Sequence, residues 1–203
     1  MKILNLYAGL GGNRKHWEGE ITAVENQSDI AFAYQDQYPD DQVVIADAHQ
    51  YLIENHSRFD FIWSSPPCQS HSKMNRTGNR KVPMYPDFRL YEEIWFLQNH
   101  FKGDWVVENV IPYYTPLITP TSRVGRHLFW SNKPIKARDV ETPENFISIG
   151  KGQATPAVLK EWLGIDIGKN IYYSGGHCPA QVLRNCVHPE IGKQVFESIR
   201  DFR

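Results

Sequence analysis

The first 110 residues alternate short apolar runs with segments of helical character, and this alternation most strongly limits the folds open to the chain. Apolar runs predict five strands, at residues 2–7, 21–25, 43–46, 59–63 and 105–107. The segments between them predict helices at residues 13–17, 27–37, 48–55 and 89–99. Strands that alternate with helices form a parallel sheet covered by helices on both faces. We therefore expect an α/β fold with a mostly parallel sheet.

The rest of the chain is less regular, because five prolines divide residues 112–143 into loops. One further strand is predicted at residues 126–130. A helix at residues 156–163 has a proline in its first turn and Gly164 as its stop, and a last helix is predicted at residues 190–202.

The length of 203 residues and a hydrophobic content of 41% are sufficient for one globular domain with a real core. No apolar run approaches the length of a membrane span, and residues 1–6 become polar too soon for a signal peptide. Three unevenly spaced cysteines form no disulfide framework, so a reducing cytoplasm is expected. Cys178 and Cys186 lack C-x-x-C spacing, so we expect no metal site.

The net charge of −1 conceals an uneven distribution along the chain. Residues 61–138 carry 11 Lys and Arg against 5 Asp and Glu, whereas residues 1–60 carry 4 against 10. Neither residues 61–86 nor residues 111–138 contain an acidic side chain. Local positive surface of this kind suits a polyanion such as nucleic acid, although a charge-segregated surface without a partner fits equally well.

Two motifs carry reactive side chains directly after predicted strands. Cys68 lies in the proline-stiffened stretch 64–70, and Glu108 follows the apolar run 105–107. The carboxyl ends of parallel strands meet at the edge of a sheet where ligands bind, so these two side chains are expected to be neighbours. A thiol nucleophile beside a proton donor can attack an electron-poor ring.

Three further strand ends have the features of a nucleotide-cofactor site. A glycine-rich turn at residues 8–12 follows the first strand, where glycines let the backbone approach a ligand. Glu25 ends the second strand and Asp47 follows the third, in positions suited to ribose hydroxyls and an adenine amino group. The glycines do not form a complete G-x-G-x-x-G, so the turn alone is a weak signal.

Taken in order, these motifs resemble those of the DNA cytosine-5 methyltransferase family over nearly the whole chain. The resemblance rests on Tyr7 and the glycine-rich turn, where the family usually has phenylalanine at the Tyr7 position. It continues through Pro67-Cys68-Gln69, Glu108-Asn109-Val110 and Arg126, and more loosely through residues 155–164 and Asn185. It implies a Rossmann-like, S-adenosylmethionine-dependent methyltransferase fold with a very small C-terminal lobe.

The resemblance also implies a role for individual residues. The catalytic residues would be Cys68 as nucleophile, Glu108 as proton donor and Arg126 as the group that steadies developing charge. S-adenosylmethionine would be bound by Tyr7, Ala8, Gly9, Leu10, Gly11, Gly12, Glu25, Asn26, Asp47, Ala48, Pro66, Asn185 and Val187. The substrate would be bound by Gln69, Ser70, Lys73, Arg76, Arg80, Asn109 and Arg123. No metal is implied.

The chain departs from the family pattern chiefly in its missing target-recognition domain. Only 24 residues, 131–154, lie between Trp130 and Thr155, too few for a separate reading domain. Residues 1–130 would form the catalytic and cofactor-binding core, 131–154 a minimal remnant of the recognition region, and 155–203 a segment that returns to the core. Val124 replaces the first arginine of the family's arginine motif, although Arg123 is adjacent, and Arg184-Asn185 replaces Gly-Asn.

The expected function is methylation of carbon 5 of cytosine in DNA, in a bacterial or phage modification setting, with a possible separate target-recognition protein. An RNA substrate such as tRNA is the main alternative, because a base that is already exposed needs less recognition surface. A free cytosine nucleotide and a non-catalytic S-adenosylmethionine-binding subunit are weaker alternatives. A nicotinamide dehydrogenase fits poorly, since the glycine spacing is wrong.

Overall fold

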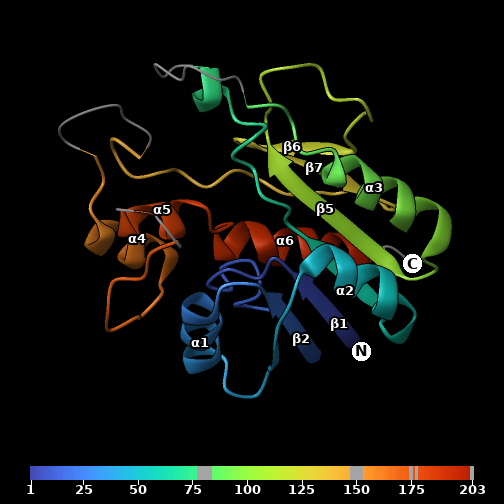
Figure 1. Ribbon diagram of the computed structural model, residues 1–203, viewed down its shortest axis with the longest axis horizontal. Helices are drawn as coiled ribbons and strands as arrows, with labels where there is room; N and C mark the ends of the chain where they lie inside the picture. Colours follow the sequence, from blue (N-terminus) through green and yellow to red (C-terminus); the bar gives the residue numbers. More distant parts are fainter. Residues whose placement is uncertain (77–83, 147–152, 174–175, 177, 202–203) are drawn as a thin grey trace.

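A mixed seven-stranded sheet forms the centre of the molecule. The computed structural model describes residues 1–76, 84–146, 153–173, 176 and 178–201. The strand order is β3-β2-β1-β4-β5-β7-β6 (Figure 1). The strands are β1 (Lys2–Leu6), β2 (Glu20–Glu25), β3 (Gln42–Ile45), β4 (Phe61–Ser64), β5 (Asp104–Val110), β6 (Ser122–Val124) and β7 (His127–Ser131). The first five are parallel, and β7 pairs antiparallel with both β5 and β6.

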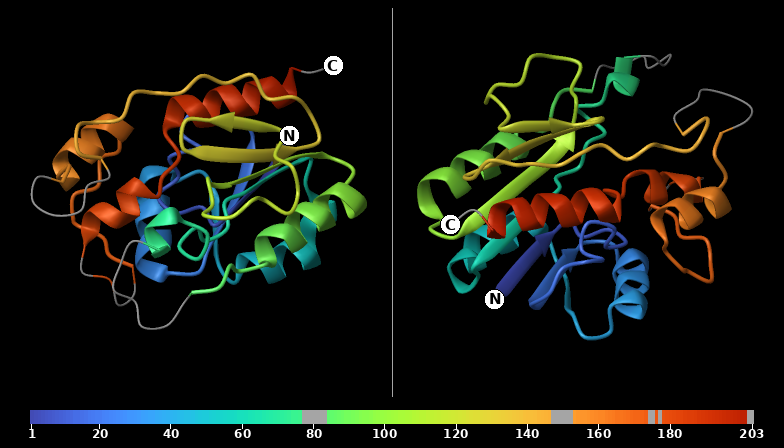
Figure 2. Two further views of the ribbon diagram at one scale, coloured as in Figure 1. Left: turned by 90° about the horizontal axis from the view of Figure 1, so that it is seen from above. Right: turned by 180° about the vertical axis from the view of Figure 1, so that it is seen from behind.

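Helices cover both faces of this sheet. They are α1 (Ser28–Gln37), α2 (Ala48–Asn55), α3 (Arg89–His100), α4 (Pro156–Leu163), α5 (Pro179–Arg184) and α6 (Pro189–Arg200), with 3-10 turns η1 (His56–Arg58) and η2 (Lys73–Arg76). Seen from above, α2 and α3 lie on one side of the sheet and α6 on the other (Figure 2, left). Because β1, β2, β4 and β5 are parallel, their carboxyl ends meet at one edge of the sheet. Ligands bind at this edge in sheets of this kind.

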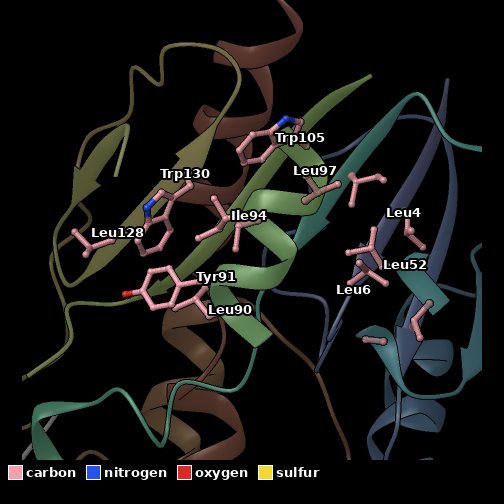
Figure 3. Close-up of a cluster of buried hydrophobic side chains, with 14 residues drawn as sticks. Leu4, Leu6, Leu52, Leu90, Tyr91, Ile94, Leu97, Trp105, Leu128 and Trp130 are labelled. Carbon is pink, nitrogen blue, oxygen red and sulfur yellow. The ribbon is translucent and has the colours of Figure 1, made fainter. Parts of the chain in front are cut away.

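The core between the sheet and helices α2 and α3 is built from alternate residues of the strands. Leu4 and Leu6 of β1 and Trp105 of β5 share a buried cluster with Leu52 of α2 and Ile94 of α3 (Figure 3). Successive strand residues point to opposite faces, so the intervening residues supply the second core under α6. The residues buried on that side include Ile3, Trp63, Val106, Phe129, Val195 and Phe196.

The first part of the segment that follows β7 lies along α6. The backbone N–H of Lys136 donates to Ser198 Oγ at 3.0 Å, and that of Arg138 donates to Gln194 Oε1 at 2.9 Å. Ile135 packs against the same core as α6. The chain here runs alongside the red helix in both Figure 1 and Figure 2.

Helices α4 and α5 close the end of the molecule near α1. Leu159 and Leu163 of α4 and Leu183 of α5 share a buried cluster with Leu10 and Ile30. Thr155 caps α4 by accepting a hydrogen bond from the N–H of Val158, and Gly164 ends it in the left-handed conformation. Among the described residues, no helix combines the length and apolar character that crossing a bilayer requires.

The predicted α/β sheet and its strands are confirmed, with ends shifted by at most a few residues. The helix predicted at residues 13–17 is wrong, since this stretch forms successive turns. Asn13 is turned inward, where its Nδ2 donates to Asn5 Oδ1 at 2.8 Å, and Arg14 forms an ion pair with Asp41 at 2.6 Å. These long-range partners prevail over a local helical preference. Strand β6 and helix α5 were not predicted from the sequence.

Candidate active site

A cavity of about 470 Å³ lies at the carboxyl ends of the parallel strands. Its volume is in the usual range for small-molecule sites. Of the residues predicted for the site, those that line it are Tyr7, Ala8, Gly9, Leu10, Gly12, Glu25, Asn26, Pro66, Cys68, Gln69, Glu108, Arg126, Asn185 and Val187. The structure therefore brings together, in one cavity, side chains from segments that are more than a hundred residues apart in sequence.

Cys68 follows β4 in a loop that is held to its surroundings by several hydrogen bonds. Asn109 Nδ2 donates to the carbonyl of Pro66 at 2.9 Å, which ties the loop to β5. The backbone N–H groups of His71 and Ser72 both donate to the carbonyl of Cys68, at 3.0 and 2.9 Å. These hydrogen bonds hold the backbone on which the Cys68 thiol is carried.

The electrostatics around Cys68 depend on its two reactive neighbours. Burial raises the pKa of the Cys68 thiol to about 11, and the charge of Glu108 acts in the same direction. The positive charge of Arg126 opposes both effects. Burial lowers the pKa of Arg126 itself, but Arg remains protonated in proteins. The thiol is thus mostly protonated at neutral pH in the free protein.

Glu108 lies on β5 and is almost completely buried. Its carboxylate oxygen Oε1 is hydrogen-bonded to Nδ1 of His127, the first residue of β7. Arg126 precedes His127 in the tight connection between β6 and β7, where its guanidinium donates to the carbonyl of Arg184. The same guanidinium lies 4.8 Å from the centre of the Phe146 ring, in cation–π geometry.

The glycine-rich turn forms the wall of the cavity opposite the cysteine loop. Glu25 Oε2 accepts a hydrogen bond from the N–H of Gly9 at 3.1 Å, and Oε1 accepts one from the N–H of Gln27 at 3.0 Å. Burial raises the pKa of Glu25, while these backbone hydrogen bonds oppose the shift. A β-carbon at Gly12 would lie 2.5 Å from the carbonyl oxygen of Val187, so only glycine allows this close approach.

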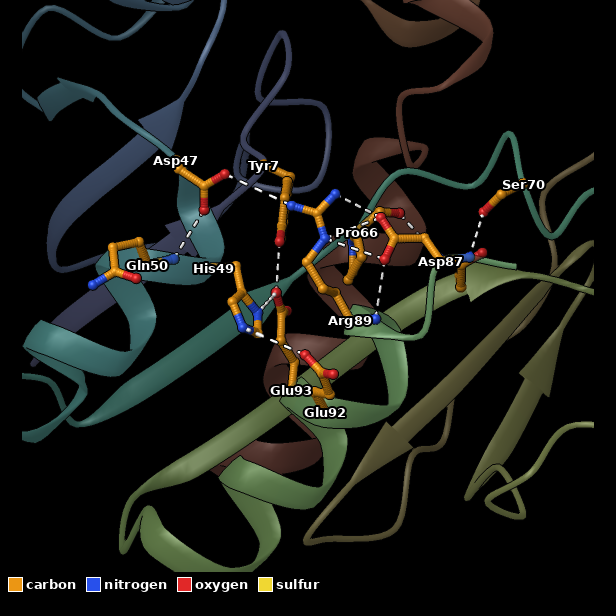
Figure 4. Close-up of polar contacts among 11 residues, drawn as sticks. Tyr7, Asp47, His49, Gln50, Pro66, Ser70, Asp87, Arg89, Glu92 and Glu93 are labelled. Carbon is orange, nitrogen blue, oxygen red and sulfur yellow. Dashed lines mark hydrogen bonds and ion pairs between the residues drawn. The ribbon is translucent and has the colours of Figure 1, made fainter. Parts of the chain in front are cut away.

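Tyr7 directly follows β1, and its side chain points toward the buried carboxylate of Glu93 (Figure 4). Its hydroxyl donates to Glu93 Oε1 at 2.5 Å, and Ser64 Oγ donates to Glu93 Oε2 at 2.5 Å. His49 Nδ1 lies 3.1 Å from Glu93 Oε1, and this contact raises the pKa of His49. Glu93 is fully buried on α3, so the network links the glycine-rich turn to three other elements.

Several residues predicted for cofactor or substrate binding do not line the cavity: Gly11, Asp47, Ala48, Ser70, Lys73, Asn109 and Arg123. Asp47 Oδ1 accepts from the N–H of Gln50 at 2.9 Å and so caps α2, while Oδ2 lies 3.8 Å from Arg89 (Figure 4). Arg123 is exposed and donates to the carbonyl of Gly125 at 3.2 Å. Arg76 ends η2, and Arg80 lies outside the described residues.

The structure adds residues that sequence reasoning missed, among them Asn13, His127, Tyr173, Gln181 and Cys186. Tyr173 accepts a hydrogen bond from Asn185 Nδ2 at 3.0 Å, and burial raises the pKa of Tyr173. Asn13 directly follows the glycine-rich turn, so proximity to that turn was a usable signal. His127 likewise directly follows Arg126, whereas no local pattern distinguishes Tyr173 from ordinary core residues.

The sheet order is that of the Rossmann-like fold class to which S-adenosylmethionine-dependent methyltransferases belong. The Entamoeba histolytica methyltransferase EhMeth has a similar fold, with a TM-score of 0.55 and 10% sequence identity. The match covers 99% of this chain and 98% of that chain. The fold class predicted from the motifs is thereby confirmed.

Within this class, residues 1–87 match the family of C-5 cytosine-specific DNA methylases. The predicted resemblance is confirmed for the part of the chain that carries the glycine-rich turn, Glu25 and Cys68. A mutant of Spodoptera frugiperda DNMT2 is 26% identical, with a TM-score of 0.38, over 54% of this chain. The chain spans 35% of the length of that DNMT2 chain. No curated protein sequence matches the chain.

Proposed function

We propose that this protein is an S-adenosylmethionine-dependent cytosine-5 methyltransferase that acts on DNA, with Cys68 as the nucleophile. The observation that carries the proposal is the convergence of Cys68, Glu108 and Arg126 on one cavity with the glycine-rich turn. The match of residues 1–87 to C-5 cytosine-specific DNA methylases supports the same conclusion.

The residues in the cavity suit the binding of S-adenosylmethionine. The backbone of the glycine-rich turn and the carboxylate of Glu25 would hold the ribose, since each Glu25 oxygen accepts one backbone hydrogen bond and keeps a lone pair for a hydroxyl donor. The exposed edge of the Tyr7 ring would contact the adenine. We leave Asp47 out of this set because it does not line the cavity.

The proposed chemistry begins with the thiolate of Cys68 bonding to carbon 6 of cytosine. Glu108 gives its proton to the ring nitrogen beside the amino group, and the electrons of the 5,6 double bond become available at carbon 5. Arg126 offsets the charge that develops at the ring. When bound, S-adenosylmethionine would supply the electrophilic methyl group: carbon 5 bonds to it with this electron pair, the sulfonium–methyl bond breaks, and S-adenosylhomocysteine is left. A base then removes the carbon 5 proton, the sulfur–carbon bond breaks to restore the thiolate, and the ring nitrogen returns its proton to Glu108.

The target base has to leave a duplex stack to reach this cavity. Lys136 and Arg138, in the segment that follows β7, are bound along α6, and only 24 residues separate Trp130 from Thr155. We propose that sequence selection is therefore short, absent or supplied by a separate target-recognition protein.

The test is nucleoside mass spectrometry after incubation with S-adenosylmethionine and duplex DNA, single-stranded DNA or total tRNA in parallel. The proposal predicts 5-methyldeoxycytidine from DNA. 5-Methylcytidine from tRNA alone would replace DNA by RNA as the substrate. Absence of product on all three substrates would contradict catalysis by the chain on its own.

Replacing Tyr7 by alanine is expected to weaken binding of S-adenosylhomocysteine by about tenfold, because it removes an aromatic contact surface. Tyr7→Phe is the matched control, since both variants lose the hydroxyl that bonds Glu93. The phenylalanine variant should bind within about threefold of the unmodified protein on the same reasoning. Isothermal titration calorimetry measures both. Equal affinities for the alanine and phenylalanine variants would move the adenine away from Tyr7.

A further inference from the structure

We propose that His127 is a positioning residue for Glu108: its Nδ1–H holds Oε1 of the carboxyl group and leaves Oε2 free to face the cytosine ring. The proposal rests on the proposed function, because it assigns to Glu108 the role of proton donor. It assigns a role to His127, which directly follows Arg126 in the chain and to which the sequence motifs gave no function.

The geometry that carries the proposal is the antiparallel pairing of β5 and β7. Glu108 is paired with Phe129 and Val110 with His127, so Glu108 and His127 are diagonal neighbours on the same face of the sheet. The carboxylate and the imidazole Nδ1 are hydrogen-bonded, and both residues are 6% exposed. Both also line the cavity that contains Cys68.

The other side chains around Glu108 do not replace this contact. Among the described residues, His127 provides the one side-chain hydrogen bond to Glu108, whereas the guanidinium of Arg126 donates to the Arg184 carbonyl. The Phe129 ring, 6.3 Å from the imidazole at an interplanar angle of 36°, packs beside it. Burial on paired strands thus restricts the rotation of the imidazole of His127. Through the hydrogen bond, it also restricts the orientation of the Glu108 carboxyl group.

The chemical consequence concerns the charge that Glu108 acquires during the reaction. When the sulfur of Cys68 bonds to carbon 6, the Oε2 proton passes to the ring nitrogen and Glu108 becomes a carboxylate. The Nδ1–H of His127 stabilises that buried carboxylate without giving up its own proton. The ring nitrogen returns the proton to Oε2 when the sulfur leaves, so His127 ends the cycle in the tautomer in which it began.

The experiment compares His127→Leu with His127→Asn, which have similar shapes but differ in one respect. The amide nitrogen of asparagine can donate from nearly the position of Nδ1, and leucine cannot donate at all. Single-turnover formation of the covalent adduct with DNA containing 5-fluorocytosine reports the step that Glu108 assists. Steady-state kcat and KM, S-adenosylhomocysteine affinity and the melting temperature are measured alongside.

We expect His127→Leu to lower kcat and the rate of adduct formation by about a hundredfold, as the loss of one preorganised donor does elsewhere. KM for DNA and affinity for S-adenosylhomocysteine should stay within about threefold, because neither depends on proton transfer. His127→Asn should recover at least about tenfold of the lost rate. In a Glu108→Gln background, His127→Leu should have little further effect on the rate, because it acts through Glu108.

Equal losses of rate in His127→Leu and His127→Asn would overturn the positioning role, and so would a change confined to KM. The role would also be overturned if the losses of rate from Glu108→Gln and His127→Leu were additive in the double variant. If the leucine variant does not fold, a normal rate in a folded His127→Ala variant would overturn it as well. An unmodified protein that forms no adduct would instead contradict the proposed function, and with it this inference. The two failures are therefore distinguishable in one set of measurements.

Discussion

Cys68→Ala is expected to abolish methyl transfer, lowering the rate by at least about a thousandfold, as loss of a covalent nucleophile does in other enzymes. Alanine has no atom that can bond to carbon 6, so the ring stays aromatic and carbon 5 stays unreactive. Binding of S-adenosylhomocysteine should change by less than about twofold, because the Cys68 loop is held by its backbone, whose hydrogen bonds the substitution retains.

The matched control for this prediction is Cys178→Ala. Cys178 is exposed and its side chain makes no capping hydrogen bond to α5, so this variant should keep the rate of the unmodified protein. The measurement is methyl incorporation into DNA under single-turnover conditions, with calorimetry for the ligand. Turnover by Cys68→Ala comparable to that of Cys178→Ala would remove Cys68 from the mechanism.

Because the pKa of Cys68 is high, the site needs a positive charge that stabilises the thiolate. With a pKa of about 11, the thiol of the free protein holds its proton at neutral pH, and only a small fraction is present as the nucleophilic thiolate. Arg126 is the cation whose charge favours the thiolate. The guanidinium of Arg126 donates to the carbonyl of Arg184, the last residue of α5. The position of this positive charge therefore depends on the end of α5.

The sheet was predictable because its signals are local. Apolar runs of three to six residues ended by polar or glycine-rich turns are short-range patterns, and five of them correspond to β1–β5. The helix predicted at residues 13–17 was wrong for the opposite reason, since Asn13 and Arg14 are held by Asn5 and Asp41, which lie 8 and 27 residues away in the chain. Strand β6 has three residues and helix α5 six, too few for a periodic pattern.

The residues of the candidate site also fall into those that could be predicted from local sequence and those that could not. Cys68 and Glu108 were placed together because parallel strands end at one edge, and β4 and β5 are neighbours. His127 could not be placed beside Glu108, because their contact depends on the register of an antiparallel pair formed across 19 residues of sequence. The role of Glu93 beneath Tyr7 likewise depends on the docking of α3, which no motif specifies.

Glu108→Gln is expected to lower kcat by about a hundredfold to ten-thousandfold, the range that positioned proton donors contribute. Glutamine keeps the shape of the side chain and an oxygen that can accept from His127, so the pairing of β5 with β7 should persist. It has no acidic proton to pass to the ring nitrogen. The developing negative charge therefore stays on the base, and attack by Cys68 becomes slow.

The decisive measurement is the rate of adduct formation with 5-fluorocytosine DNA, which should fall by the same factor as kcat if the proton is transferred during attack by sulfur. Glu92→Gln is the matched control, because Glu92 is exposed on α3 and lies outside the cavity. Adduct formation at the normal rate in Glu108→Gln would show that proton transfer and sulfur attack are separate. Glu108 would then act after the adduct has formed, and His127 would have to be tested at that later step.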